Sequence, residues 1–272
     1  MPIVKVGDIN MYYEIHGEGE PLVLIPGRGA KVEQFFMHIP VFSRTHKVIA
    51  FDPRGAGRTD APDIPYTFKM MADDLAGLIN IINIDSAHIL GTSMGGNIAQ
   101  EFVLHYPERV TSLILACTGF GPAHSVPTTD PEVIEYFQNP KVLPLKESAM
   151  QTARLGMSQE FINNNSDLIT QVIDYNMEHP SPPQGQMGQM QAAMSHDTYD
   201  RLPTIKAPTI VIHGDADRIV PVENSRIMAS RIPRAELAIL KKMGHFFFWE
   251  AFDEFNRIVL DFLRRHSATK AR

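Results

Sequence analysis

Short apolar runs, many of them bounded by glycine or proline, recur along the first half of the chain and again after residue 206. Such runs are typical of buried strands. They lie at residues 21–27, 47–52, 87–91, 111–117, 207–214 and 236–240. Two earlier segments, 2–6 and 9–16, alternate apolar and polar positions on either side of Gly7-Asp8, which predicts two strands joined by a turn. Apolar runs without alternation favour a mostly parallel sheet that is covered on both faces.

Between these runs lie stretches whose apolar positions follow a helical period. In residues 67–83 the apolar side chains recur three, four or seven positions apart, and in residues 251–264 they share one face. Helices are also expected at 94–106, after a glycine-rich turn, and at 222–231, after Pro221. The alternation of strands and helices predicts an α/β fold, a doubly wound and mostly parallel eight-stranded sheet with helices on both faces.

Residues 120–203 follow a different pattern. They contain no convincing buried strand and are rich in methionine, glutamine, asparagine and proline. A structureless loop of this length is improbable in a compact domain, so we expect a helical cap resting on the sheet. Its predicted helices cover residues 131–137, 146–156, 158–176 and 184–195, with a break in the segment 179–190. The predicted organisation is one domain, with a core formed by residues 1–119 and 204–272 and the cap inserted at 120–203.

Composition and charge narrow the class of protein. The chain has 272 residues, 44% of them hydrophobic and 21% charged, which is ordinary for a globular α/β domain. Its net charge of −6 disfavours nucleic acid as a partner. A single cysteine, Cys117, excludes an intrachain disulfide, and its apolar surroundings predict a buried core residue. Neither a signal peptide nor a membrane-spanning run is evident, so we expect a cytoplasmic protein without a membrane partner.

A candidate nucleophile lies between a predicted strand and a predicted helix. Gly91-Thr92-Ser93-Met94-Gly95 matches G-x-S-x-G, in which a sharp turn exposes the serine hydroxyl. Glycines flank the serine because strand and helix approach closely there and leave no room for a Cβ. The N–H that follows the serine stands at a helix N-terminus, where it stabilises an oxyanion. The motif alone is weak evidence, but its strand-turn-helix context indicates a nucleophilic Ser93.

A serine hydroxyl needs a general base, and the base needs an acid that orients it. Asp215 and Asp217 both follow the predicted strand 207–214, so either aspartate is a candidate for the acid. Among the 11 histidines, His245 is preceded by Gly244 and followed by an amphipathic helix. The order serine, aspartate, histidine along the chain is the one found in α/β-hydrolases.

Five segments resemble the α/β-hydrolase superfamily, in its capped branch of carboxylesterases, enol-lactonases and C–C hydrolases. They are PLVLIPG, FDPRGAGRTD, GTSMGGNIAQ, HGDADRIVP and GHFFFWEAFDEFNRIVLDFL. The resemblance covers nearly the whole sequence outside the cap. It implies that Asp217 is the acid, through the pattern G-x-x-D-x-x-x-P. It also implies an oxyanion hole formed by the backbone N–H groups of Arg28 and Met94, although this chain has Pro26-Gly27 where the family usually has His-Gly.

A serine nucleophile separates the chain from haloalkane dehalogenases and epoxide hydrolases, whose elbow carries aspartate. The resemblance implies a serine-dependent carboxylesterase that cleaves an ester of small or medium size through an acyl-enzyme. It implies no cofactor and no metal ion. Lactonase and C–C bond hydrolase are alternatives within the fold. A ligand receptor or signalling protein with slow turnover is an alternative of another class.

The substrate pocket is expected to include Gly27, Phe120, His124 and Phe246. Arg28 has two interpretations, because its guanidinium is placed either to bind a substrate carboxylate or to form an outward salt bridge. The expected partner is a small-molecule ester. A homodimer is a candidate assembly, and the sequence leaves the oligomeric state open.

Overall fold

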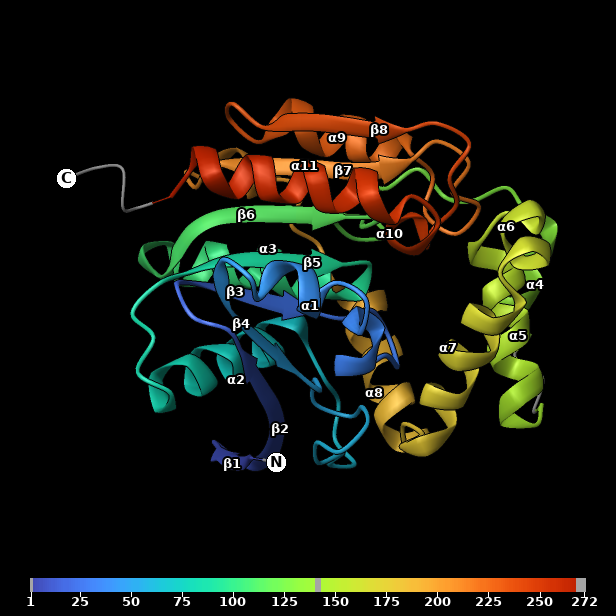
Figure 1. The fold of residues 1–272 in the computed structure, drawn as a ribbon, viewed down its shortest axis with the longest axis horizontal. Coiled ribbons are helices and arrows are strands. Elements are labelled where there is room, and N and C mark those ends of the chain that lie inside the picture. Colours follow the sequence, from blue (N-terminus) through green and yellow to red (C-terminus); the bar gives the residue numbers. More distant parts are fainter. Residues whose placement is uncertain (1, 140–142, 268–272) are drawn as a thin grey trace.

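The computed structural model describes residues 2–139 and 143–267, and eight strands in this part form one sheet (Figure 1). The strand order is β1-β2-β4-β3-β5-β6-β7-β8. The strands are β1 (Ile3–Val6), β2 (Ile9–His16), β3 (Glu20–Ile25), β4 (His46–Phe51), β5 (Ala87–Thr92), β6 (Val110–Ala116), β7 (Thr209–Gly214) and β8 (Glu236–Leu240). All eight strands were predicted from the sequence, and the mostly parallel α/β fold is confirmed.

Strands β1 and β2 form a hairpin at one edge, and β2 pairs with β4 in the antiparallel sense. From β4 to β8 every pairing is parallel. Every residue of β5 and β7 is buried, because helices cover both faces of the sheet. The parallel strands therefore end at one shared edge, where the segments that follow β3, β5, β7 and β8 come together.

Two hydrophobic clusters lie on opposite faces of the sheet. Alternate side chains of β3 divide between them, with Val23 and Ile25 in one cluster and Leu22 and Leu24 in the other. The first cluster is covered by α2 (Phe68–Ile81), α3 (Met94–His105) and α9 (Glu223–Arg231), and the second by α1 (Ile39–Phe42) and α11 (Phe252–Arg265). Cys117 is fully buried, as predicted, and burial raises the pKa of its thiol well above the ordinary value.

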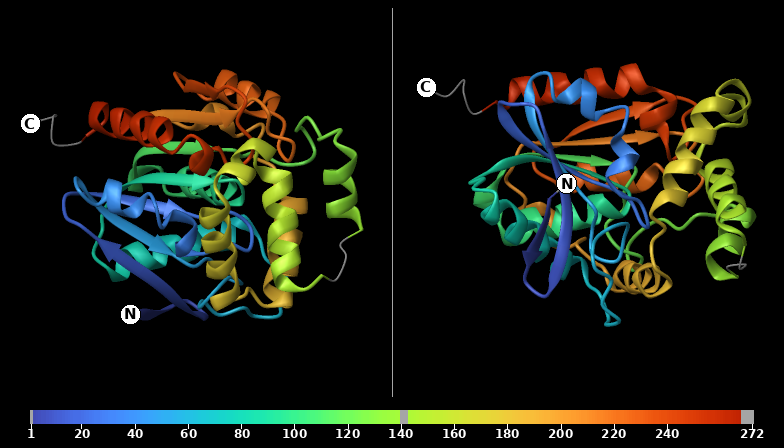
Figure 2. Two further views of the ribbon diagram at one scale, coloured as in Figure 1. Left: turned by 45° about the vertical axis from the view of Figure 1, so that its right-hand side comes forward. Right: turned by 60° about the horizontal axis from the view of Figure 1, so that its bottom comes forward.

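The insertion, residues 120–203 between β6 and β7, lies beyond the end of the sheet to which the parallel strands point (Figures 1 and 2). It contains α4 (Pro131–Gln138), α5 (Leu145–Gly156), α6 (Gln159–Asn164), α7 (Ser166–Glu178) and α8 (Pro183–Ser195). The single helix predicted at 158–176 is wrong, because Asn165 leaves the helical conformation at φ −130° and ψ 43° and separates α6 from α7. The predicted break ends at Pro182, since Pro183 occupies the first turn of α8, where proline is tolerated.

Several short elements were missed by the sequence patterns. They are the 3-10 helices η1 (Val32–Phe35), η2 (Pro107–Arg109) and η3 (Leu202–Thr204), together with α1 and α10 (Phe247–Glu250). None is longer than one turn or so, and a hydrophobic period is not visible over so few residues. Within the described part of the chain, no helix has the length and apolar character needed to cross a membrane.

Candidate active site

Ser93 stands on a sharp turn between β5 and α3, with φ 52° and ψ −119°. A non-glycine residue with positive φ is strained and persists only where its surroundings hold it. The flanking glycines allow the close approach. A Cβ on Gly95 would lie 2.1 Å from the carbonyl oxygen of Ile25, and one on Gly91 would lie 2.2 Å from that of Gly95. The turn thus presents the Ser93 hydroxyl at the end of the sheet.

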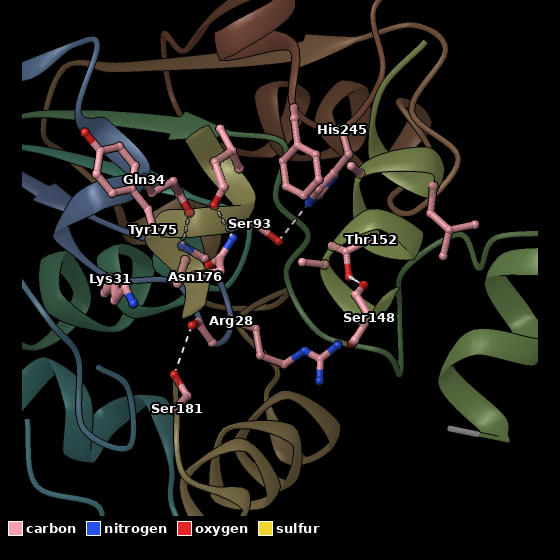
Figure 3. Close-up of a pocket in the computed structure, with 18 of the residues that line it drawn as sticks. Arg28, Lys31, Gln34, Ser93, Ser148, Thr152, Tyr175, Asn176, Ser181 and His245 are labelled. Atoms are coloured by element: carbon pink, nitrogen blue, oxygen red, sulfur yellow. Dashed lines mark hydrogen bonds between the residues drawn. The ribbon is translucent and has the colours of Figure 1, made fainter. Parts of the chain in front are cut away.

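The structure brings Ser93, His245 and Asp217 together. His245 Nε2 lies 3.0 Å from Ser93 Oγ, and its Nδ1 lies 2.7 Å from Asp217 Oδ2. Figure 3 shows the first of these contacts, with Ser93 and His245 facing each other across the pocket. Asp215, the other candidate acid, is exposed and accepts a hydrogen bond from the Lys242 N–H. The geometry therefore selects Asp217 as the partner of His245.

The Asp217 carboxylate is buried and held by four donors. Its Oδ1 accepts the backbone N–H groups of Ile219 and Val220, at 2.8 and 2.9 Å. Its Oδ2 lies between His245 and His213, whose Nε2 is 3.0 Å away. Burial raises the pKa of Asp217, but the two histidines lower it by more, so the pKa lies well below its ordinary value. The carboxylate is ionised at neutral pH, so it can accept the Nδ1–H of His245 and orient the ring.

His213, a buried residue of β7, also contacts the acid. Its Nε2 lies 2.8 Å from the carbonyl oxygen of Val220, so that nitrogen carries a proton and donates. Its Nδ1 lies 2.5 Å from Ser225 Oγ. His213 is thus anchored on both sides of its ring, and it holds one face of the Asp217 carboxylate. No sequence pattern distinguished this histidine from the other core histidines.

The resemblance implies an oxyanion hole formed by two backbone N–H groups, those of Arg28 and Met94. The N–H of Met94 is at the first position of α3 and has no intrahelical acceptor. The N–H of Arg28 makes no hydrogen bond within the described residues. Arg28 lines the pocket that contains Ser93, and Met94 directly follows Ser93 at the start of α3.

Gln34, on η1, is a supporting residue that the sequence did not indicate. Its Oε1 accepts the N–H of Gly27 at 3.0 Å, and its Nε2 donates to Thr92 Oγ1 at 2.6 Å. The buried side chain thereby ties the loop after β3 to the residue that precedes Ser93. This link fixes the loop in a chain that has proline where the family usually has histidine.

The insertion contacts the same loop from the other side. Gln189, on α8, accepts the N–H of Gly29 at 2.8 Å and donates to the carbonyl oxygen of Arg54 at 2.9 Å. Ser181 donates from its hydroxyl to the carbonyl oxygen of Gly29 at 3.0 Å. Both backbone polar groups of Gly29 are therefore held by the insertion. No periodic pattern in the glutamine-rich segment revealed these contacts.

A cavity of about 270 Å³ adjoins Ser93 and is enclosed by the loop after β3, α5, α7 and the segment around His245. Gly27 and Phe246 line it, as expected. Phe120 and His124 do not. Phe120 is fully buried and packs on Tyr199, and His124 stacks on the same tyrosine at 4.5 Å between ring centroids. These two residues lie at the base of the insertion, away from the cavity, so their predicted place in the pocket is corrected.

The described residues contain no group of three or more His, Cys, Asp or Glu side chains positioned to hold a metal ion. The acidic and histidine side chains around Ser93 are engaged with one another instead.

Comparison with known proteins agrees with this geometry. The family model described as alpha/beta hydrolase fold matches residues 20–252. The chain is 30% identical to 2-hydroxy-6-oxononadienedioate/2-hydroxy-6-oxononatrienedioate hydrolase 1 of Pseudomonas putida, over 94% of this chain and 92% of the relative. It is 31% identical to the poly(3-hydroxyalkanoate) depolymerase of Ectopseudomonas oleovorans, over 90% and 84%.

Among solved structures, a thermophilic esterase from Thermogutta terrifontis in a malate-bound form superimposes with a TM-score of 0.83 and 25% identity, covering 98% of this chain and 99% of that one. The eight-stranded sheet, the nucleophile elbow and the matched family model agree with one another. The chain belongs to the α/β-hydrolase family and is a hydrolase of that fold.

Proposed function

We propose that this protein is a serine carboxylesterase that cleaves an ester of small or medium size through an acyl-enzyme. One observation carries the proposal. The hydroxyl of Ser93 lies 3.0 Å from His245 Nε2, and the other ring nitrogen of that histidine lies 2.7 Å from the buried carboxylate of Asp217. A nucleophile, a base and an orienting acid within hydrogen-bond distance form the arrangement used for acyl transfer.

In the first half-reaction, Ser93 Oγ attacks the ester carbonyl carbon while its proton passes to His245 Nε2. The imidazolium donates from Nδ1 to Asp217, whose charge stabilises it. The carbonyl oxygen becomes an oxyanion that accepts the N–H groups of Arg28 and Met94. When the C–O bond breaks, His245 gives its proton to the departing alkoxide oxygen, which leaves as the alcohol.

In the second half-reaction, water attacks the acyl-Ser93 carbonyl and gives a proton to His245 Nε2. The tetrahedral intermediate then collapses, the carboxylic acid leaves, and Ser93 Oγ recovers its proton from His245. Losing one oxyanion donor raises the barrier by roughly 3–4 kcal/mol, so the two backbone donors contribute strongly to the rate.

Two relatives support ester cleavage. A poly(3-hydroxyalkanoate) is a chain of hydroxy acids joined by ester bonds, and the depolymerase named for it is 31% identical to this chain. The Thermogutta terrifontis structure is that of an esterase. The cavity of about 270 Å³ has a size that suits a small or medium acyl group.

A C–C bond hydrolase is the second candidate, and one observation favours it. The Pseudomonas putida relative is named for a dienedioate, which carries two carboxylates. In this chain the Arg28 side chain extends into the cavity, where it offers a cation to such a group (Figure 3). A lactonase would use the same Ser93 chemistry on a cyclic ester.

The experiment that tests the proposal compares wild type with Ser93→Ala on p-nitrophenyl esters of short and medium acids, followed by nitrophenol release. We expect fast turnover by wild type and loss of at least about 10³-fold in the variant. Ser230→Ala, which removes an exposed hydroxyl on α9, is the matched control and should behave as wild type.

An active Ser93→Ala variant would contradict the role of Ser93. A wild type that is inert on esters but active on lactones or dienoic diketo acids would assign the chain to one of the other hydrolase classes. Turnover far below about 1 per second on all of these compounds would favour a slow receptor.

A further inference from the structure

Arg28 contributes more to the cavity than its backbone. It follows β3 in the loop beside Ser93, and its side chain extends into the cavity (Figure 3). The guanidinium carbon lies 5.2 Å from the centre of the Phe137 ring, and the Tyr136 hydroxyl is a further neighbour. Both neighbours are neutral and belong to α4. Burial lowers the pKa of Arg28 from its ordinary value, and Tyr136 offsets only part of that effect.

The cavity supplies no carboxylate to this cation. Apart from His245, the charged residues that line the cavity are Arg28, Lys31 and Glu33. Glu33 is engaged by Arg58, whose guanidinium nitrogen lies 2.9 Å from it, and the Lys31 ammonium donates to the His179 carbonyl oxygen at 2.9 Å. Within the described residues, no carboxylate lies within 4.0 Å of the Arg28 guanidinium.

Two other arginines that turn into the protein, Arg54 and Arg58, are paired with acids. Arg54, only 3% exposed, contacts Asp74 at 2.7 Å, and Arg58 contacts Asp52 at 2.8 Å. Removing a charge from water without a partner is costly, and an arginine does not escape that cost by losing its proton. Arg28 has no such acid, and of these three arginines it is the one that lines the cavity of the nucleophile.

The chemistry of the group identifies the missing partner. A guanidinium is a planar fork whose N–H groups match the two oxygens of a carboxylate. Much of the remaining lining is apolar, including Leu145, Ala149, Met157, Val172, Phe246 and Phe248. A ligand that fits has an apolar stretch between the reacting carbonyl and an anionic end.

We propose that the Arg28 side chain binds a carboxylate of the substrate, so that the enzyme prefers half-esters of short dicarboxylic acids to neutral esters. This inference rests on the proposed function and narrows its substrate. One residue then has two roles, because its backbone N–H meets the oxyanion while its side chain meets the carboxylate. The separation of the two substrate groups is limited by the reach of one arginine side chain, which favours acids such as glutaric or adipic acid.

The test measures kcat/KM for 4-nitrophenyl hydrogen adipate and 4-nitrophenyl hexanoate, which match in carbon number and differ in the terminal charge. In wild type we expect the adipate ester to be preferred. Arg28→Met should lower the adipate-to-hexanoate ratio by about 10- to 100-fold, the range of a hydrogen bond to a charged group. Arg28→Lys keeps the positive charge but lacks the planar guanidinium, so its adipate-to-hexanoate ratio should lie between those of wild type and Arg28→Met.

Arg257→Met, on α11, is the control for the change in net charge, since its side chain is 66% exposed and remote from the cavity. It should keep the wild-type ratio. A wild type that prefers hexanoate, or an Arg28→Met variant that loses activity equally on both esters, would overturn the inference. The second outcome would mean that only the loop backbone had been disturbed.

Binding provides a readout that does not need turnover. Calorimetry with free adipate, compared with neutral adipamide, should show adipate binding to wild type and to Ser93→Ala but not to Arg28→Met. If neither ester is turned over, the proposed esterase function fails while adipate binding still decides the role of Arg28. If the hexanoate ester is hydrolysed, but free adipate does not bind and the adipate ester is not preferred, the esterase function is supported and the carboxylate site at Arg28 is refuted.

Discussion

Gln189, on α8 of the insertion, accepts a hydrogen bond from the backbone N–H of Gly29 at 2.8 Å, and Gly29 adjoins the proposed oxyanion donor Arg28. The same amide donates to the Arg54 carbonyl oxygen, and the Gln189 side chain is fully buried. The insertion is thus joined to the part of the core where the oxyanion would form. A shift of α8 would move the loop after β3 through this hydrogen bond. A substrate that contacts the insertion would therefore also affect the position of the proposed oxyanion donor.

This contact gives a first prediction. Gln189→Ala should lower kcat by about 10- to 100-fold, because a small displacement of the Arg28 N–H weakens the transition-state contact. KM should change less. The measurement is steady-state kinetics on a neutral p-nitrophenyl ester, with circular dichroism to verify the fold. Gln191→Ala, from an exposed position on the same helix, is the control. Equal kcat values in the two variants would show that the hydrogen bonds of Gln189 have no role in catalysis.

A second prediction separates the two aspartates after β7. Asp217→Asn should lower kcat by roughly 10³- to 10⁴-fold, because an amide no longer holds the imidazolium or fixes its tautomer. Asp215→Asn should stay within a few-fold of wild type, since Asp215 is exposed and bonds the Lys242 N–H. Both variants are assayed on the same ester. The reverse ranking would transfer the acid role to Asp215.

A third prediction concerns the glycine that follows the nucleophile turn. In Gly95→Ala the new methyl group would lie 2.1 Å from the Ile25 carbonyl oxygen, and neither backbone can yield without moving β3 or α3. We expect a loss of about 1–3 kcal/mol in the free energy of unfolding, together with a loss of activity. Urea unfolding measures the first. Gly27→Ala is the matched control, because its nearest neighbours would lie at 3.4 Å, and comparable stability of both variants would refute the steric argument.

The sequence predicted the elements of the core because each has a strong local signature. Apolar runs identified the strands, and helical periodicity identified α2 and α11. Ser93, Asp217 and His245 were selected because they follow predicted strands in the chain order serine, aspartate, histidine. Those three side chains meet because parallel strands end together, which is a property of the fold rather than of spacing.

The supporting contacts of the site had no such signature. Gln34 and Gln189 act through single side-chain amides, and a glutamine on an irregular or polar helix looks the same whether it is solvated or buried. The insertion was equally hard to interpret. The face of α8 that meets the core contains small residues such as Gly185 and Gly188 instead of a large apolar stripe, so its contact surface left little hydrophobic pattern. Phe120 was misplaced in the pocket because it lies in the irregular segment after β6, where no periodic pattern indicates the direction of a side chain.

A fourth prediction concerns acid stability and rests on Glu101, a buried carboxylate on α3. Arg201 donates to it at 2.9 Å, and His196 Nδ1 lies 3.4 Å away. Burial raises the pKa of Glu101, but His196 and Arg201 lower it by more, from 4.5 to about 2. Because the pKa is lower in the folded than in the unfolded chain, the ionised carboxylate stabilises the fold above pH 4.5.

That stabilisation, on the order of 3 kcal/mol, should be lost as the pH falls from about 4.5 to about 2. Glu101→Gln should be less stable than wild type at pH 7, and its stability should fall less steeply through this window. Urea unfolding at a series of pH values measures both. Glu108→Gln, an exposed position just beyond α3, should follow the wild-type curve. A Glu101→Gln curve parallel to wild type throughout would mean that other carboxylates determine the acid transition, since removing the Glu101 charge would then have left the pH dependence intact.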